Sequence, residues 1–143
     1  MTDLAAAIGL VQLGHLEAWN EARIANACRL TERLRSLELP ADGRVTLPEV
    51  RPGDRHVFHQ YTVQLAEREH VQRHLEGAGV GTAVHYPVPI HHQPVIRELG
   101  LGDASLPVAE ELAKRVLSLP VHPGLTEDDV ERIAREVEAA LQM

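Results

Sequence analysis

Apolar residues at the start of the chain recur at helical spacing. Leu4, Ile8 and Val11 fall on one face of a helix, and Leu10 and Leu13 widen that face until the segment is apolar almost all round. A helix of this kind needs cover on more than one side. We therefore expect this segment to pack against something larger than a single neighbouring helix.

The same period continues further along the chain. Ala27, Leu30, Leu34 and Leu37 keep the helical spacing, while the charged residues between them face water. Pro40 cannot continue a helix. The pattern therefore predicts one long helix over about the first forty residues.

Shorter patterns in the middle of the chain predict strands. Residues 61–65 alternate with β-forming side chains, and residues 80–86 and 116–119 form two further short apolar runs before prolines. A short edge strand is expected at 45–47. Residues 67–77 fit a short helix between the first two main strands, with apolar side chains inward.

The last third of the chain carries helix signals. A short helical turn is expected at 95–99, and Pro107 suits the first turn of a further helix. The final helix has the clearest signature, because Thr126 can cap it and Asp129 stands at the capping-box position. Its buried stripe consists of Val130, Ile133, Val137 and Leu141.

These elements predict an α+β fold in a single domain over residues 1–143. We expect a small, mostly antiparallel sheet of about three strands, packed by helices and preceded by the long N-terminal helix. A doubly wound parallel fold would need more strands.

The composition is that of a globular protein, and the charge excludes one class of partner. Hydrophobic residues make up 44% of the sequence and charged residues 24%, with a formal net charge of −7. The arginines are scattered and form no basic stripe, so a nucleic-acid partner is not expected.

The sequence also indicates the compartment. Cys28 is the single cysteine, which rules out an internal disulfide and fits a reducing environment. We expect it to be a small core or partly buried residue rather than a catalytic one. Neither a leader peptide nor a membrane-spanning stretch is evident, so no membrane is expected and the cytoplasm is the default location.

Nine histidines are many for this length, and two pairs invite a metal site. His70 and His74 stand at positions i and i+4 of a predicted helix, which can direct two imidazoles to one ion. They lie on its polar face, where a solvated surface is the better interpretation. His56 and His59 lack an identifiable third ligand. No metal site is therefore predicted.

A connection rich in proline and histidine follows the second predicted strand. His85, Tyr86 and His91 lie along residues 85–91, which Pro87 and Pro89 stiffen. Rigid loops that present polar groups are common at binding sites. A proline-stapled turn whose histidines satisfy local backbone groups would explain the composition equally well.

The remaining candidates for chemistry favour a surface interpretation. The neighbouring carboxylates Glu110 and Glu111 fit a solvated helix face, and Lys114, the only lysine, fits an exposed position on the same helix. A lysine that forms a Schiff base needs a desolvated or cation-neighboured site, which nothing local offers. No residue is therefore predicted to be catalytic.

Taken together, several segments resemble the DegT/DnrJ/EryC1/StrS family of pyridoxal-phosphate-dependent sugar aminotransferases. Each is short, but they stand in the family's order and span nearly the whole chain. The segments are Met1 to Leu10, His59-Gln60-Tyr61, His85-Tyr86-Pro87-Val88-Pro89-Ile90-His91, Leu106-Pro107-Val108-Ala109-Glu110 and Ser118-Leu119-Pro120-Val121-His122-Pro123.

The resemblance implies the small C-terminal domain of the aspartate aminotransferase fold. Family members transfer an amino group from glutamate or glutamine to a nucleotide-linked keto sugar, and a homo-oligomer is expected. By resemblance, the proline-rich connection lies near the mouth of the active site, and Tyr86, His91 and His85 are the candidates for substrate contact.

The part of the family that binds the cofactor has no counterpart here. The lysine that forms the aldimine with pyridoxal phosphate, the aspartate that pairs with the pyridine nitrogen and the phosphate-binding residues are all missing. No residue of this chain is therefore expected to bind the cofactor, and the chain alone is expected to be inactive. The alternatives are a stand-alone binding or scaffold module derived from this domain and, ranked last, a small histidine-rich metal protein.

Overall fold

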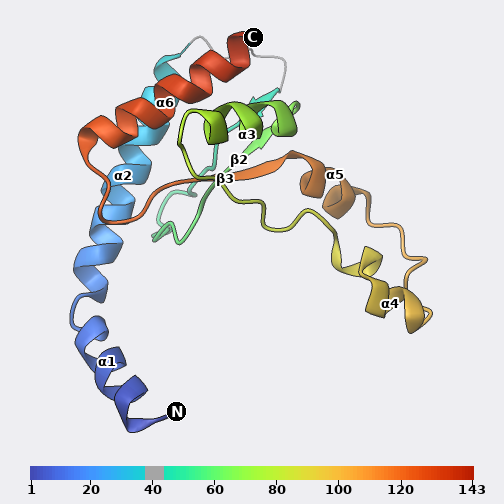
Figure 1. The fold of residues 1–143 in the computed structure, drawn as a ribbon, viewed down its shortest axis with the longest axis horizontal. Helices are drawn as coiled ribbons and strands as arrows, with labels where there is room; N and C mark the ends of the chain where they lie inside the picture. The colour runs from blue at the N-terminus through green and yellow to red at the C-terminus, as the bar shows by residue number, and fades with distance from the viewer. Residues whose placement is uncertain (38–43) are drawn as a thin grey trace.

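The computed structural model describes residues 1–37 and 44–143, which form helices around a small antiparallel sheet (Figure 1). The strands lie in the order β1-β2-β3, and both pairings are antiparallel. The predicted α+β class is confirmed. In chain order the elements are α1 (Asp3–Leu13), α2 (Leu16–Ser36), β1 (Val45–Thr46), β2 (Tyr61–Leu65), α3 (Arg68–Gly77), the 3-10 turn η1 (Ile90–His92), α4 (Pro94–Glu98), α5 (Pro107–Arg115), β3 (Val116–Leu119) and α6 (Glu127–Gln142).

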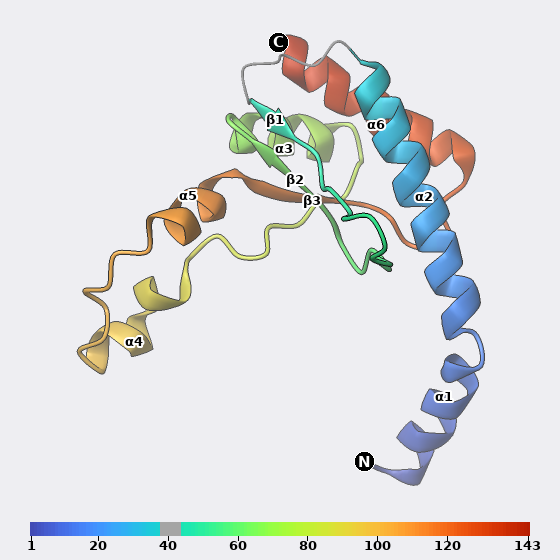
Figure 2. The ribbon, with the colours of Figure 1, turned by 180° about the vertical axis from the view of Figure 1, so that it is seen from behind.

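The core lies where α2, α3 and α6 meet the sheet. In β2, Tyr61, Val63 and Leu65 are buried, whereas the two residues between them are only half-buried, as strand alternation requires. Val63 stands opposite the buried Leu117 of β3. Helix α6 packs against both α2 and α3, and both views show α6 and α2 crossing each other (Figures 1 and 2).

The predicted long N-terminal helix is wrong in its continuity, because the structure has two helices. Helix α1 ends at Leu13 and α2 begins at Leu16, with Gly14 and His15 between them. Glycine is a poor helix former, and it permits the break at little cost. The predicted cap at Thr2 is confirmed. The predicted stop at Pro40 lies outside the described residues.

Helix α1 buries none of its residues in this chain. It extends beyond the body of the molecule as the dark blue end of the ribbon, while α4 projects from the body in another direction (Figure 1). Across residues 1–37 and 44–143, no helix is both long and apolar enough to cross a lipid bilayer.

The strand predicted at 80–86 is wrong. Only Ala83 makes a bridge, to Ser118 of β3, and the chain then leaves the sheet. The prolines at 87 and 89 explain the short contact, since they cannot donate ladder hydrogen bonds and hold the backbone in a fixed conformation. The other predicted strands, at 45–47, 61–65 and 116–119, are confirmed by β1, β2 and β3.

Helix α6 begins with the predicted capping box. Thr126 Oγ1 accepts a hydrogen bond from the backbone N–H of Asp129 at 3.2 Å, and Asp129 Oδ2 accepts from the N–H of Thr126 at 2.8 Å. The hydrogen bonds from Thr126 hold the pKa of Asp129 below its ordinary value. Because the pKa is lower in the folded state, this contribution to stability is present above the ordinary pKa of aspartate and is lost as the pH falls through the depressed value.

Replacing Thr126→Ala is expected to lower the free energy of unfolding by about 1 kcal/mol, the usual value of an N-cap side chain. Urea unfolding at pH 7 measures the change. Ser105→Ala, which removes a hydroxyl from an exposed loop, is the matched control and should leave the midpoint unchanged. Equal midpoints for the two variants would show that the capping box contributes nothing.

Candidate functional site

The connection that follows Ala83 carries the three predicted contact residues. His85 remains close to the sheet, since its Nδ1 lies 3.3 Å from Oγ of the buried Ser118. The ring of Tyr86 meets that of His85 edge-on at 5.5 Å, and Tyr86 is 73% exposed. Tyr86 is therefore an anchored but accessible aromatic side chain, which suits contact with a ligand or another protein surface.

His91 is buried, unlike Tyr86, and contacts helix α5. Its Nε2 lies 3.1 Å from Oε1 of Glu110, and the same oxygen accepts the backbone N–H of Leu106 at 2.9 Å. The hydrogen bond from Leu106, and then the one from His91, hold the pKa of Glu110 below its ordinary value, so it remains a carboxylate at neutral pH. The interpretation of Glu110 as plain solvated surface is wrong.

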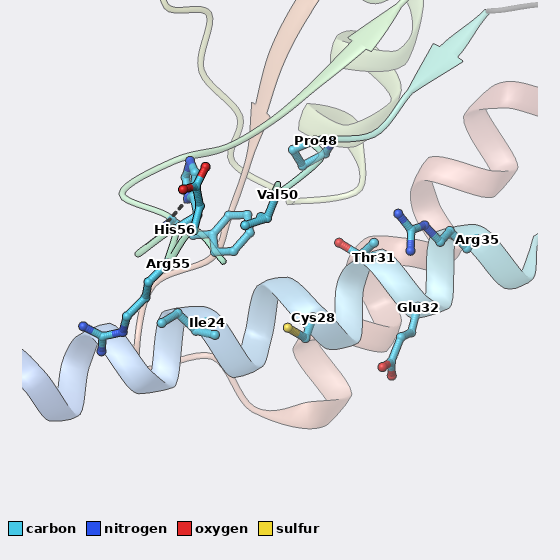
Figure 3. A pocket seen from close by; sticks show the side chains of 11 residues that line it. Ile24, Cys28, Thr31, Glu32, Arg35, Pro48, Val50, Arg55 and His56 are labelled. Atoms are coloured by element: carbon cyan, nitrogen blue, oxygen red, sulfur yellow. Dashed lines mark hydrogen bonds between the residues drawn. The ribbon is translucent and has the colours of Figure 1, made fainter. Parts of the chain in front are cut away.

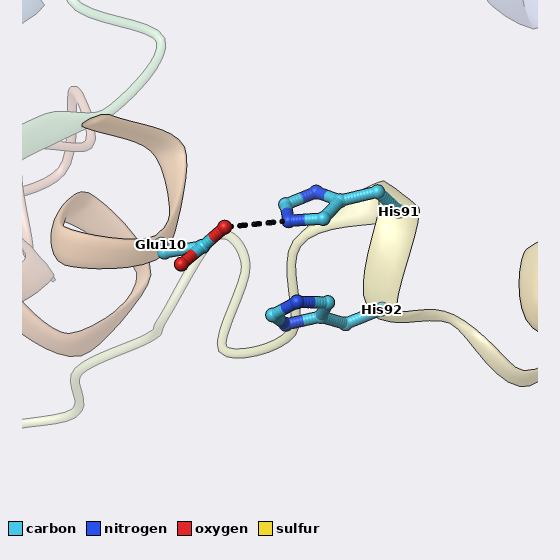
Figure 4. Close-up of side chains that lie close together, drawn as sticks. All are labelled: His91, His92 and Glu110. Carbon is cyan, nitrogen blue, oxygen red and sulfur yellow. Dashed lines mark hydrogen bonds and ion pairs between the residues drawn. The ribbon is translucent and has the colours of Figure 1, made fainter. Parts of the chain in front are cut away.

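His92 completes a cluster with His91 and Glu110 (Figure 4). The two imidazole centroids are 4.1 Å apart, and one potential ligand atom from each of the three residues lies within 4.8 Å of the others. Sequence reasoning did not pair these residues, because α4 and a loop separate η1 from α5 in the sequence. Both His91 and Glu110 do lie in segments that resemble the same family, which was the one available signal.

The histidine pairs chosen from spacing behave differently. His74 Nε2 lies 3.1 Å from Oε2 of Glu136 on α6, so this side of α3 is an interhelical contact rather than the solvated face expected. His70 Nε2 is buried without a hydrogen-bond partner among the described residues. His56 Nδ1 accepts the backbone N–H of Phe58 at 2.9 Å, which is a local turn contact.

A pocket of about 410 Å³ runs along α2 beneath the loop at 48–58 (Figure 3). Cys28 borders it and is exposed, so the expectation that Cys28 is buried or partly buried is wrong. Arg55 closes one side and donates to Glu21 on α2 at 2.6 Å. The remaining lining residues are Ile24, Thr31, Glu32, Arg35, Pro48, Val50, Asp54, His56 and Phe58.

The only lysine lies on the surface, as predicted. The side chain of Lys114 is 73% exposed, and its Nζ lies 3.6 Å from Glu111 Oε2. A lysine that forms a Schiff base needs a desolvated site, which an exposed ammonium group beside a carboxylate does not have.

Helix α1 presents an apolar surface that this chain leaves uncovered. Leu4, Ile8 and Val11 are 73%, 51% and 66% exposed, and Leu10 and Leu13 are exposed beside them. Contiguous apolar surface of this kind is typical of an interaction site. No part of the chain that the structure describes covers this helix, although its sequence pattern predicts that it needs cover.

The model of the DegT/DnrJ/EryC1/StrS aminotransferase family matches residues 1–138. The chain is 38% identical to the erythromycin biosynthesis sensory transduction protein EryC1 of Saccharopolyspora erythraea, with 97% of this chain and 37% of that protein covered. It is 36% identical to a dTDP-3-amino-3,4,6-trideoxy-alpha-D-glucose transaminase of Streptomyces venezuelae, with 93% and 34% covered.

The fold is also similar to that of a solved structure. NtdA from Bacillus subtilis, whose structure contains bound cofactor PMP, superposes with a TM-score of 0.86 at 28% identity, over all of this chain and 33% of that one. The chain thus spans about a third of the length of the proteins it matches.

Proposed function

Because the chain belongs to the DegT/DnrJ/EryC1/StrS aminotransferase family, we propose that it forms the C-terminal small domain of a nucleotide-sugar aminotransferase. The complete enzyme would use pyridoxal phosphate to transfer an amino group from glutamate or glutamine to a nucleotide-linked keto sugar. The observation that carries this proposal is that α1 is apolar and uncovered, in a chain that spans about a third of the length of its relatives. A large domain packed on α1 would supply the missing cover.

The residues present do not fit pyridoxal phosphate. The cofactor needs a lysine in a desolvated pocket, an acid against its ring nitrogen and donors for its phosphate. The single lysine is exposed and paired with Glu111, and it lines none of the pockets found among the described residues. In this proposal the rest of the enzyme holds the cofactor, and the 143 residues alone are inactive.

The role of this chain would be to border the substrate site. Tyr86 is accessible and can contact the substrate. His85 is held by Ser118 of the sheet, and the ring of His85 in turn supports the ring of Tyr86. His91 is buried against Glu110, so its part is to hold the shape of the connection rather than to reach the sugar. This refines the expectation that all three residues contact substrate.

We also propose that the complete enzyme is a cytoplasmic homo-oligomer. The connection and α4 expose further apolar side chains, among them Ile90, Val95, Leu99 and Leu101, which suits a subunit contact. Light scattering of the hybrid enzyme described next measures its size, and a monomer would contradict this part of the proposal.

A hybrid enzyme tests the main proposal. The last third of the Streptomyces venezuelae transaminase is replaced by this chain, and amino transfer is followed on the keto sugar of that relative. We expect measurable turnover, with the substitution Tyr86→Ala in the hybrid raising KM because an exposed contact is removed. A folded hybrid that binds the cofactor but never transfers an amino group would contradict the proposed role and favour a non-catalytic module.

The chain alone is the control. Incubated with pyridoxal phosphate and treated with borohydride, it is expected to show no amino transfer and no stable adduct on Lys114, because that ammonium group is exposed and paired with Glu111 rather than desolvated. Mass spectrometry of tryptic peptides reads the result. Transamination by the isolated chain would overturn the assignment of the chemistry to a large domain.

A further inference from the structure

The His91–His92–Glu110 cluster has the form of a metal site. Residues of η1 supply two imidazoles that point from the turn toward α5, and α5 supplies a carboxylate opposite them (Figure 4). One donor atom from each residue lies within 4.8 Å of the other two, and the His91 Nε2 to Glu110 Oε1 distance is already 3.1 Å. Ligands of a tetrahedral Zn²⁺ ion with bonds of about 2.0–2.1 Å stand roughly 3.3 Å apart.

We propose that His91, His92 and Glu110 bind one divalent transition-metal ion, of which Zn²⁺ is the representative. Two imidazoles and one carboxylate are a ligand set that Zn²⁺ takes in proteins with a fourth position left open to water. The assignment does not depend on the proposed aminotransferase role. It reverses the prediction of no metal site, which considered only the His70–His74 and His56–His59 pairs.

The surroundings hold two of the three ligands, His91 and Glu110, in place before any ion arrives. His91 is buried, and the N–H of Leu106 fixes the Glu110 carboxylate. Gln93 Nε2 donates to the carbonyl of Val88 at 3.2 Å and closes the turn that carries both histidines. Fixed ligands lower the entropy cost of coordination, and hydrogen bonds to the ligands keep them in position.

In the proposed site, a rotation of the His92 side chain would complete the coordination of the ion. His91 and Glu110 stand at the ligand spacing already, while His92 is half-buried and can turn its imidazole toward them. A plain hydrogen bond between His91 and Glu110 would need no contribution from His92. The contribution of His92 therefore separates a metal site from a structural His–Glu contact.

Titration of the metal-free 143-residue chain with ZnCl₂, followed by calorimetry and by competition with a chromogenic chelator, tests the proposal. We expect one saturable ion per chain. His92→Ala and Glu110→Gln are each expected to weaken binding at least about tenfold, because the loss of a direct ligand costs no less than the loss of a supporting residue. Co²⁺ should give the visible absorption of a tetrahedral site in the parent chain and lose it in both variants.

Two controls keep the result interpretable. His59→Ala removes an exposed imidazole from outside the cluster and should leave the affinity unchanged. Circular dichroism and the Tm show whether each variant folds, and His92→Ala is chosen because its side chain is not part of the buried core. Absence of saturable binding in the parent chain, or binding that His92→Ala leaves unchanged, would overturn the assignment.

Discussion

A chain that carries Leu4→Glu, Ile8→Glu and Val11→Glu is expected to remain folded and to lose the ability to complement a large domain supplied as a separate polypeptide. The three side chains are more than half exposed and no α1 residue is buried, so their replacement removes nothing from the core of this chain. Burying each one against a partner would contribute about 1.5–3 kcal/mol. Losing all three should weaken association by over about a thousandfold.

The measurement is amino transfer in cells that produce the first two-thirds of the Streptomyces venezuelae transaminase together with this chain. Gln12→Glu adds one negative charge at an exposed polar position of the same helix and serves as the control. Activity that survives the triple substitution would show that α1 does not dock on a large domain. Unfolding of the chain itself would show that α1 supports its core.

The elements that the sequence predicted correctly are those whose patterns are local. Strand β2 alternates buried and half-buried residues over five positions, and α6 combines a capping box with a regular apolar stripe. Hydrogen bonds within a turn and the period of a helix depend only on near neighbours, so the sequence contains them directly. Both elements appear at the expected residues.

The errors occur where contacts between residues distant in the sequence decide the structure. A strand over 80–86 was plausible from its side chains, but only Ala83 reaches an edge of the sheet. The long first helix kept its period across Gly14, and periodicity does not register a break at a single residue. Cys28 follows the helical pattern yet faces a pocket, because the loop that borders it leaves that side of α2 open.

In the candidate site, too, local spacing was visible in the sequence and contacts between distant residues were not. Spacing within the sequence indicated His70 with His74, but the tertiary contact joins His74 to Glu136 instead. The contact of His91 with Glu110 spans a loop that no periodicity describes. Two helical or turn segments must be placed side by side before such a pair exists. The sequence could therefore offer residues 85–91 as either a binding loop or a proline-rich turn, but it could not indicate the carboxylate that His91 contacts.

Replacing Leu117→Ala is expected to lower the free energy of unfolding by about 2–5 kcal/mol. Leu117 is fully buried in β3, stands opposite Val63 of β2 and belongs to the single core shared by α2, α3 and α6. Its loss removes apolar contacts and leaves a cavity that close-packed neighbours fill only in part. Urea unfolding of the isolated chain measures the change in midpoint at constant m-value.

Leu99→Ala is the matched control, because it makes the same chemical change at a side chain that is 66% exposed and should alter stability by less than about 0.5 kcal/mol. A large difference between the two variants means that the 143 residues build their own core. Equal effects would mean that this core is ordered only when a large domain is present. Complementation would then measure coupled folding rather than docking, and the triple substitution on α1 would have to be judged by the folding of the assembled enzyme.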